Sequence, residues 1–107
     1  GDRVYAVIHG SAVNSDGDSS GSMGTPSSIG QEELIRAALR DAQIAPADVT
    51  YVEAHGTGTR AGDPVELGVL STVLSEGRPS GSRAWVGSVK SNIGHTEATA
   101  GVAGLIK

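Results

Sequence analysis

The chain has 107 residues, of which 37% are hydrophobic and 3% aromatic, with 16 glycines, no cysteine and a formal net charge of −4. This length supports one small domain with an aliphatic core, and the lack of cysteine excludes disulfides and a thiol nucleophile within these residues. The acidic balance and the absence of a long apolar run argue against nucleic acid or a membrane as partner. The first residues do not resemble a signal peptide, so we expect a cytoplasmic protein.

The first half of the sequence predicts a strand, a loop and a helix. Residues 4–13 are β-branched and apolar enough for a strand buried on both faces. Residues 14–29 predict a surface loop, whose DGDSSG resembles a calcium loop but lacks the flanking helices and the final bidentate Glu. Residues 31–43 have apolar side chains at i, i+3, i+4 spacing, which predicts an amphipathic helix with Ser28 as the start of a capping box.

The second half predicts two more strands, each followed by a helix. Residues 49–54 read as a strand, and residues 65–75 as a helix with Pro64 in its first turn. After a loop at residues 76–83, residues 85–89 predict a short buried strand. The alternation of strands and helices favours an α/β fold, with a mainly parallel or mixed sheet covered by helices.

The last residues of the chain predict a glycine turn and a helix of small side chains. Thr96 is placed to cap a helix over residues 96–107, and Glu97 lies in its first turn, where the helix dipole favours a carboxylate. Glycine costs roughly 1 kcal/mol in a helix interior relative to alanine, so its density here indicates close packing against another backbone. We therefore expect this helix to be buried.

Two predicted strands lead into loops that each present a histidine, His55 in HGTGT and His95 in NIGH. Loops at the carboxyl ends of parallel strands share one edge of the sheet, so the two imidazoles should converge there. Lys90 follows the third predicted strand, and a cation at this edge suits stabilisation of a carboxylate or an oxyanion. The pattern predicts an active site in which charge develops on a substrate oxygen.

Other readings of these residues have less support. Gly-Thr-Gly-Thr could grip a phosphate, but the Walker lysine and the dinucleotide-binding spacing are both missing. His55, Asp63 and His95 could bind a metal, but no close i, i+4 pair is present, and we expect no metal. For Glu97, pairing with Lys90 and a direct catalytic role are equally consistent with the sequence. Glu53 and Glu66 are interpreted as salt-bridge partners.

Two long motifs in this order resemble a known family. VEAHGTGTRAGDPVEL (residues 52–67) and VGSVKSNIGHTEATAGVAGLIK (residues 86–107) resemble the two histidine motifs of the β-ketoacyl synthase domain of type I polyketide synthases. AVIHGSAVNSDG (6–17) and GQEELIRAAL (30–39) are similar to the segment that precedes them. The resemblance implies that residues 1–107 are an incomplete ketosynthase domain with a partial thiolase-like fold, from its C-terminal half.

The resemblance also implies a chemistry. In this family a Cys-His-His triad performs decarboxylative Claisen condensation between an acyl thioester and a malonyl-type extender. His55, His95 and Lys90 match the catalytic residues, and Thr57 and Thr59 match the threonines that contact the phosphopantetheine arm. We expect Asp63, Asn92 and Glu97 to support these residues in the predicted site.

The resemblance further implies which partners the domain binds and that the domain is incomplete. The domain would bind no cofactor of its own, and its substrates would arrive on the phosphopantetheine of an acyl carrier protein. Acyltransferase and other synthase domains would be neighbours, and the full-length enzyme would be a homodimer. Because the chain lacks cysteine, we expect the nucleophile upstream of Gly1 and no activity from these residues alone. The alternatives are an unrelated α/β ligand-binding module and a non-catalytic ketosynthase-like partner protein.

Overall fold

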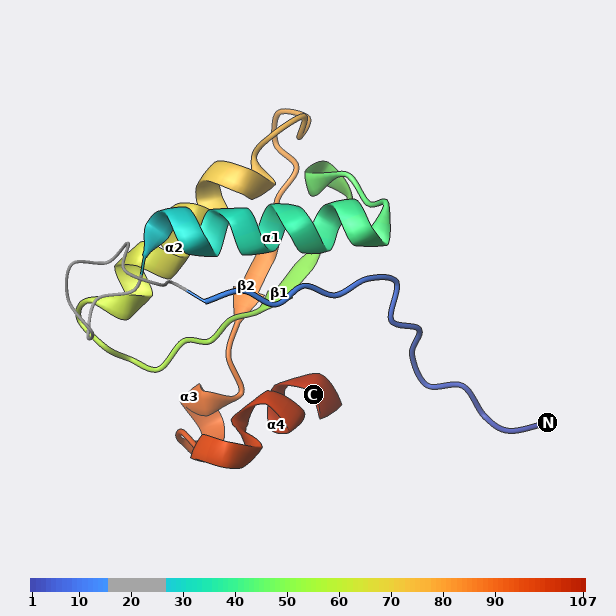
Figure 1. Ribbon diagram of the computed structural model, residues 1–107, viewed down its shortest axis with the longest axis vertical. Coiled ribbons are helices and arrows are strands. Elements are labelled where there is room, and N and C mark those ends of the chain that lie inside the picture. The colour runs from blue at the N-terminus through green and yellow to red at the C-terminus, as the bar shows by residue number, and fades with distance from the viewer. Residues whose placement is uncertain (16–26) are drawn as a thin grey trace.

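The structure, a computed structural model, describes residues 1–15 and 27–107 (Figure 1). The DGDSSG segment that resembles a calcium loop lies outside the described residues. The elements, in chain order, are α1 (Ser28–Ala42), the 3-10 turn η1 (Pro46–Asp48), β1 (Tyr51–Glu53), α2 (Gly62–Leu74), β2 (Trp85–Gly87), α3 (Lys90–Ile93), the 3-10 turn η2 (Glu97–Thr99) and α4 (Ala100–Ile106).

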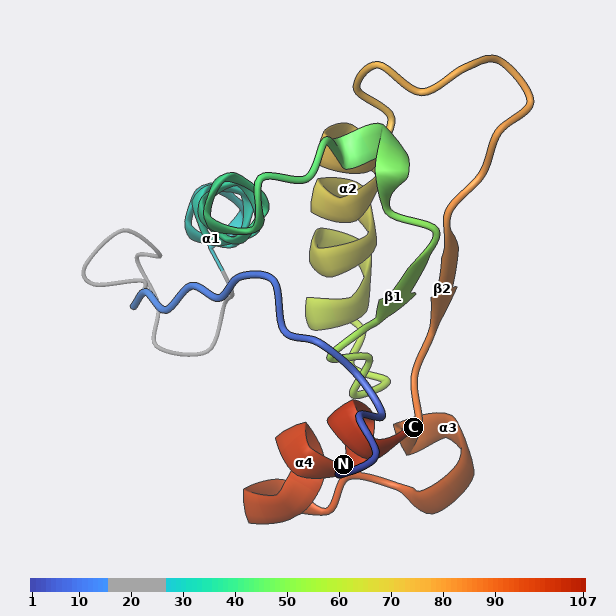
Figure 2. The same ribbon diagram turned by 90° about the vertical axis from the view of Figure 1, so that its right-hand side faces the viewer.

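The two strands form a parallel sheet that helices cover on one side. β1 pairs with β2 so that Tyr51 lies opposite Trp85 and Glu53 opposite Gly87. Figure 2 shows α2 between α1 and the sheet, with α3 and α4 at the carboxyl ends of the strands. The predicted α/β class with a parallel sheet is confirmed. Among the described residues, no helix is both long and apolar enough to cross a lipid bilayer.

The core is centred on α2. Its apolar residues lie on several sides of the helix, and α2 is packed between α1 and the sheet, so opposite sides of the helix are covered. Val73 is 0% exposed, and the other buried apolar residues of this helix are Val69, Leu70 and Leu74. Alternate residues of a strand point to opposite faces, so Val52 and Ala54 face α2 while Tyr51 and Glu53 lie on the opposite face.

The strand predicted over residues 4–13 does not form, and the prediction that it is buried is wrong. Val4, Ile8 and Val13 are 73%, 74% and 96% exposed. A strand exists only when its backbone groups pair with a neighbour, and the sheet of the described residues contains β1 and β2 alone. The β-branched sequence favours an extended backbone but provides no pairing partner.

The first helix begins earlier than predicted. α1 starts at Ser28, and Ser27 is the N-cap, whose Oγ accepts a hydrogen bond from the Gly30 N–H at 3.1 Å. The predicted role of Ser28 as the cap is therefore wrong by one residue. Two adjacent serines can both cap a helix, and the sequence does not distinguish them.

Three expectations for the last part of the chain are also wrong. Trp85 in β2 is 72% exposed rather than buried. α4 begins at Ala100, without a side-chain cap from Thr96, because Glu97 adopts a φ of 51° and interrupts the helix there. Leu105 and Ile106 are 73% and 79% exposed, so the predicted burial of this helix is not observed. No described element covers that side of α4.

Candidate active site

The two histidines meet at the carboxyl edge of the sheet, as the sequence predicted. His55 follows β1, and His95 follows α3 through Gly94. Their ring centres are 5.7 Å apart and the ring planes are perpendicular. The half-buried Lys90 lines a cavity of about 720 Å³ together with both rings. Two imidazoles and an ammonium therefore face one space.

His95 is held by a turn within its own segment. Gly94 has φ 75° and ψ −179°, a conformation that is essentially restricted to glycine. The backbone N–H of Glu97 donates to Nδ1 of His95 at 3.0 Å. When the imidazole is neutral and Nδ1 accepts, the proton lies on Nε2. The turn thus makes Nε2–H the hydrogen-bond donor of this ring.

The loop of His55 is held by carboxylates of α2. Glu66 accepts from the His55 N–H at 2.6 Å with Oε1 and from the Gly56 N–H at 2.9 Å with Oε2. Asp63 Oδ1 accepts from the Gly58 N–H at 3.2 Å. Asp63 thereby fastens the loop after His55 to α2, and its supporting role in the site stays a prediction. The interpretation of Glu66 as a salt-bridge partner is wrong, since among the described residues it bonds to backbone amides instead.

The two threonines differ in their surroundings. Thr57 is half-buried and lines a cavity of about 420 Å³ that it shares with Asp63, Lys90 and His95. Thr59 is exposed, and its Oγ1 accepts from the Gly62 N–H at 3.0 Å at the start of α2. The structure thus brings Thr57 to the histidine site and uses the Thr59 hydroxyl to close the loop onto α2.

Glu97 and Asn92 do not make the contacts that would mark direct roles. The described residues contain no ion pair between Glu97 and Lys90, so that predicted pairing is wrong; Glu97 reaches His95 through its backbone. Asn92 is exposed and donates to Ser91 Oγ at 3.2 Å, with no hydrogen bond to either histidine in the described part of the chain. No group of three or more potential metal ligands occurs within residues 1–15 and 27–107.

Glu53 links more segments of the site than its sequence position indicated. Its Oε1 accepts from the Val89 N–H, and its Oε2 accepts from the Tyr51 hydroxyl at 2.7 Å and from Lys107 Nζ at 2.9 Å. The Val89 N–H, followed by Lys107 and Tyr51, lowers the pKa of Glu53 to about 2. The expected salt bridge of Glu53 is present, but its partner lies 54 positions away in the sequence.

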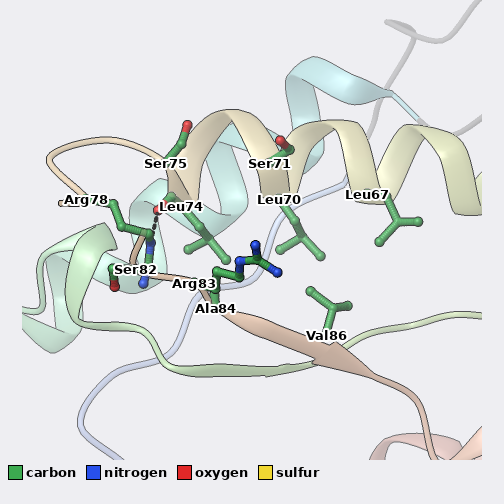
Figure 3. A pocket seen from close by; sticks show the side chains of 10 residues that line it. All are labelled: Leu67, Leu70, Ser71, Leu74, Ser75, Arg78, Ser82, Arg83, Ala84 and Val86. Carbon is green, nitrogen blue, oxygen red and sulfur yellow. Dashed lines mark hydrogen bonds between the residues drawn. The ribbon is translucent and has the colours of Figure 1, made fainter. Parts of the chain in front are cut away.

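A separate groove lies on the other side of the sheet from Glu53, between α2 and β2 (Figure 3). Its floor is apolar, formed by Leu67, Leu70, Leu74, Ala84 and Val86. Arg78 lies at one end, where its Nε donates to the Leu74 carbonyl at 2.8 Å and its guanidinium also donates to the Pro46 and Val49 carbonyls. Arg78 therefore closes the carboxyl end of α2, and neither histidine lines this groove.

The chain is similar to known proteins over nearly all of its length. The family described as the C-terminal domain of β-ketoacyl synthases matches residues 5–107. All 107 residues align with polyketide synthase GfsE of Streptomyces halstedii at 55% identity, and with a phenolphthiocerol/phthiocerol polyketide synthase of Mycobacterium tuberculosis at 58%. The chain spans 3% and 6% of these two proteins.

Solved ketosynthases have the same fold. The oxazolomycin ketosynthase domain OzmH KS8 of Streptomyces albus JA3453 superposes with a TM-score of 0.91 at 40% identity, over 99% of this chain and 28% of that one. The ketosynthase from module 6 of the bacillaene synthase of Bacillus subtilis 168 gives 0.89 at 47% identity, over 97% and 18%. The chain therefore belongs to the β-ketoacyl synthase family, within its C-terminal domain, and has part of the thiolase-like fold of that family.

Proposed function

We propose that this chain provides the two-histidine portion of a polyketide ketosynthase that catalyses decarboxylative Claisen condensation. The 5.7 Å separation of the His55 and His95 rings is the observation that carries the proposal. Residues 52–67 and 86–107 are then the two histidine motifs of the active site. Homology to polyketide synthases over the whole chain supports the same reaction.

The reaction places negative charge on one oxygen. A nucleophile from outside these residues accepts the acyl chain as a thioester. The bond between the malonyl α-carbon and its carboxylate then breaks, carbon dioxide leaves, and the electron pair forms an enolate on the thioester. The enolate carbon attacks the acyl thioester, a carbon–carbon bond forms, and the thiolate of the nucleophile leaves.

The imidazoles are suited to hold that enolate oxygen. With hydrogen bonds of about 2.9 Å from ring nitrogen to oxygen, two rings whose centres are 5.7 Å apart can donate to one atom between them. The Glu97 N–H on Nδ1 orients the Nε2–H of His95 for this purpose. Preorganised donors of this kind are each worth about 3–4 kcal/mol in the transition state. Lys90 adds a positive charge that stabilises the malonyl carboxylate or the oxyanion.

The substrate arm and the partners follow from the same proposal. Thr57, in the cavity that His95 and Lys90 also line, and Thr59 beside it in the loop contact the phosphopantetheine arm of the acyl carrier protein. The domain binds no cofactor itself. It works in the cytoplasm, in a homodimeric synthase with an acyltransferase and further domains, and the 107 residues alone are inactive.

The test uses a complete ketosynthase domain that contains these residues, either the natural one or the bacillaene ketosynthase with this segment exchanged. His95→Ala should abolish carbon dioxide release from malonyl-carrier but leave acyl transfer to the nucleophile partly intact, because the enolate forms only when carbon dioxide leaves. The two steps are measured separately, by carbon dioxide release and by mass of the acylated protein. Equal loss of both would contradict this division, and an inactive unsubstituted domain would favour a non-catalytic partner protein.

A further inference from the structure

Three polar side chains form a cluster on the face of the sheet opposite α2. We call Tyr51, Glu53 and Lys107 the Glu53 cluster. Lys107 Nζ donates to the Tyr51 hydroxyl at 2.7 Å and to Glu53 Oε2 at 2.9 Å, and the Tyr51 hydroxyl donates to the same carboxylate oxygen at 2.7 Å. The three groups therefore satisfy one another and hold the carboxylate in one orientation.

Two glycines leave the space that this cluster occupies. A Cβ on Gly87 would lie 2.7 Å from the Tyr51 hydroxyl and 3.3 Å from Lys107 Nζ. A Cβ on Gly104 would lie 3.2 Å from Glu53 Cγ. The first contact is closer than atoms pack, so a side chain opposite Glu53 in β2 would displace the Tyr51 hydroxyl from its place in the cluster. The cluster is thus built into both the sheet and α4.

The free carboxylate oxygen connects the cluster to the active site. Glu53 Oε1 accepts from the Val89 N–H, and Val89 is directly followed by Lys90. On its own strand, Glu53 lies two residues before His55. One carboxylate therefore joins the backbone that carries the lysine to the strand that carries a histidine, and Lys107 joins both to the end of α4.

We propose that Glu53 is a positioning residue of the ketosynthase, which fixes the backbone of Lys90 relative to His55, and that Lys107 and Tyr51 hold its carboxylate for that role. The inference rests on the proposed function. It adds residues that line the same cavity of about 720 Å³ and act through Lys90. A displacement of about 1 Å at a catalytic group can reduce a rate about 100-fold, so loss of this link should slow the reaction.

The test compares Glu53→Gln with Glu32→Gln in the complete ketosynthase domain. Glu32 also forms an ion pair, with Arg36 at 2.9 Å, but on α1 and away from the histidines, so it is a matched control. We expect Glu53→Gln to lower kcat for carbon dioxide release about 10- to 100-fold with KM unchanged, since positioning acts on the reacting groups. Glu32→Gln should keep the kcat of the unsubstituted domain. Unchanged kcat in Glu53→Gln would overturn the proposal.

A double substitution separates positioning from a general loss of structure. In a Lys90→Met background the group that Glu53 positions is missing, so adding Glu53→Gln should lower the residual kcat by less than about twofold. If Glu53→Gln lowers kcat as much in the Lys90→Met background as it does when Lys90 is present, Glu53 only maintains the fold. If Glu53→Gln lowers the folded fraction, the same comparison with and without Lys90→Met is made with Tyr51→Phe. This substitution removes one hydrogen bond to Glu53 Oε2.

The outcomes also separate this inference from the proposed function. If His95→Ala and Lys90→Met abolish or slow carbon dioxide release while Glu53→Gln and Tyr51→Phe do not, the ketosynthase assignment stands and the positioning role is wrong. If the unsubstituted domain releases no carbon dioxide, the proposed function itself is contradicted. The Glu32→Gln control must match the unsubstituted domain for the positioning role to stand.

Discussion

The two histidines lie side by side, but the chain holds them in different ways. The backbone at His55 is fixed from a distance by Glu66, eleven residues further along the chain on α2. The ring of His95 is fixed locally, by the conformation of Gly94 and by the N–H of Glu97 two residues away. A local turn leaves a clear trace in the sequence, whereas a side chain that reaches back from a helix does not. The same difference determines which substitutions should disturb each histidine.

Removal of a histidine should have the largest effect. His55→Ala deletes one proposed donor to the enolate oxygen and should lower kcat for condensation about 100- to 1000-fold. His55→Asn keeps a side-chain donor and should recover part of that loss. His9→Ala, at an exposed histidine outside the site, is the control in the same steady-state assay and should leave kcat unchanged. Equal rates for His55→Ala and His9→Ala would remove His55 from the mechanism.

Loss of the distant anchor should have the next largest effect. Glu66→Ala leaves the N–H groups of His55 and Gly56 without their acceptors, so the loop should shift and kcat should fall about 10- to 100-fold. Glu33→Ala, at an exposed carboxylate of α1, is the matched control. The measurement is kcat in the complete domain, with circular dichroism to compare folding. A Glu66→Ala enzyme as fast as the control would show that the loop holds itself, as the His95 turn does.

The local turn should respond to backbone strain. Gly94→Ala places a side chain at φ 75°, ψ −179°, and should cost about 1–3 kcal/mol of unfolding free energy. Gly101→Ala is the control, because a Cβ there meets no atom within 4 Å and alanine suits a helix interior better than glycine, by about 1 kcal/mol. Urea denaturation measures both. Equal midpoints for the two variants would mean that the turn conformation is not required.

The smallest expected effect is a pH dependence of stability. The pKa of Glu53 falls from 4.5 to about 2 on folding, chiefly because its carboxylate accepts the Val89 N–H. A lowered pKa stabilises the fold fully above pH 4.5, and this contribution is lost as the pH falls from 4.5 towards 2. Glu53→Gln should therefore flatten the fall in unfolding free energy over this interval, measured by denaturant titration at each pH. An unchanged slope would contradict the lowered pKa.

Local patterns in the sequence predicted part of the fold. The spacing of apolar residues within 31–43 and 65–75 located α1 and α2, because the period of that spacing shows which side of a helix is buried. The segment 4–13 has an equally clear pattern and forms no strand, since strand formation depends on a neighbour and not on composition. The small residues of α4 indicated close packing, yet Leu105 and Ile106 are exposed.

The part of the site that could be predicted is the part placed by the carboxyl ends of the strands. The meeting of His55 and His95 follows from parallel strands that end at one edge. The anchors of these residues were not predictable. Lys107 bonds to Glu53 across 54 positions and Glu66 bonds to the backbone, so no periodicity or spacing in the sequence reports either contact. The pairing of Glu97 with Lys90 failed because a left-handed residue replaced the expected helix start.

Both imidazoles are proposed to donate to one substrate oxygen. The most direct measurement is a crystal structure of the complete ketosynthase domain with a malonyl-pantetheine analogue that carries a stable bond in place of the thioester. The account predicts the analogue carbonyl oxygen within about 2.7–3.1 Å of Nε2 of both His55 and His95, the range for donors to an oxyanion. An oxygen bound by only one histidine, or by backbone amides with both rings turned away, would contradict it.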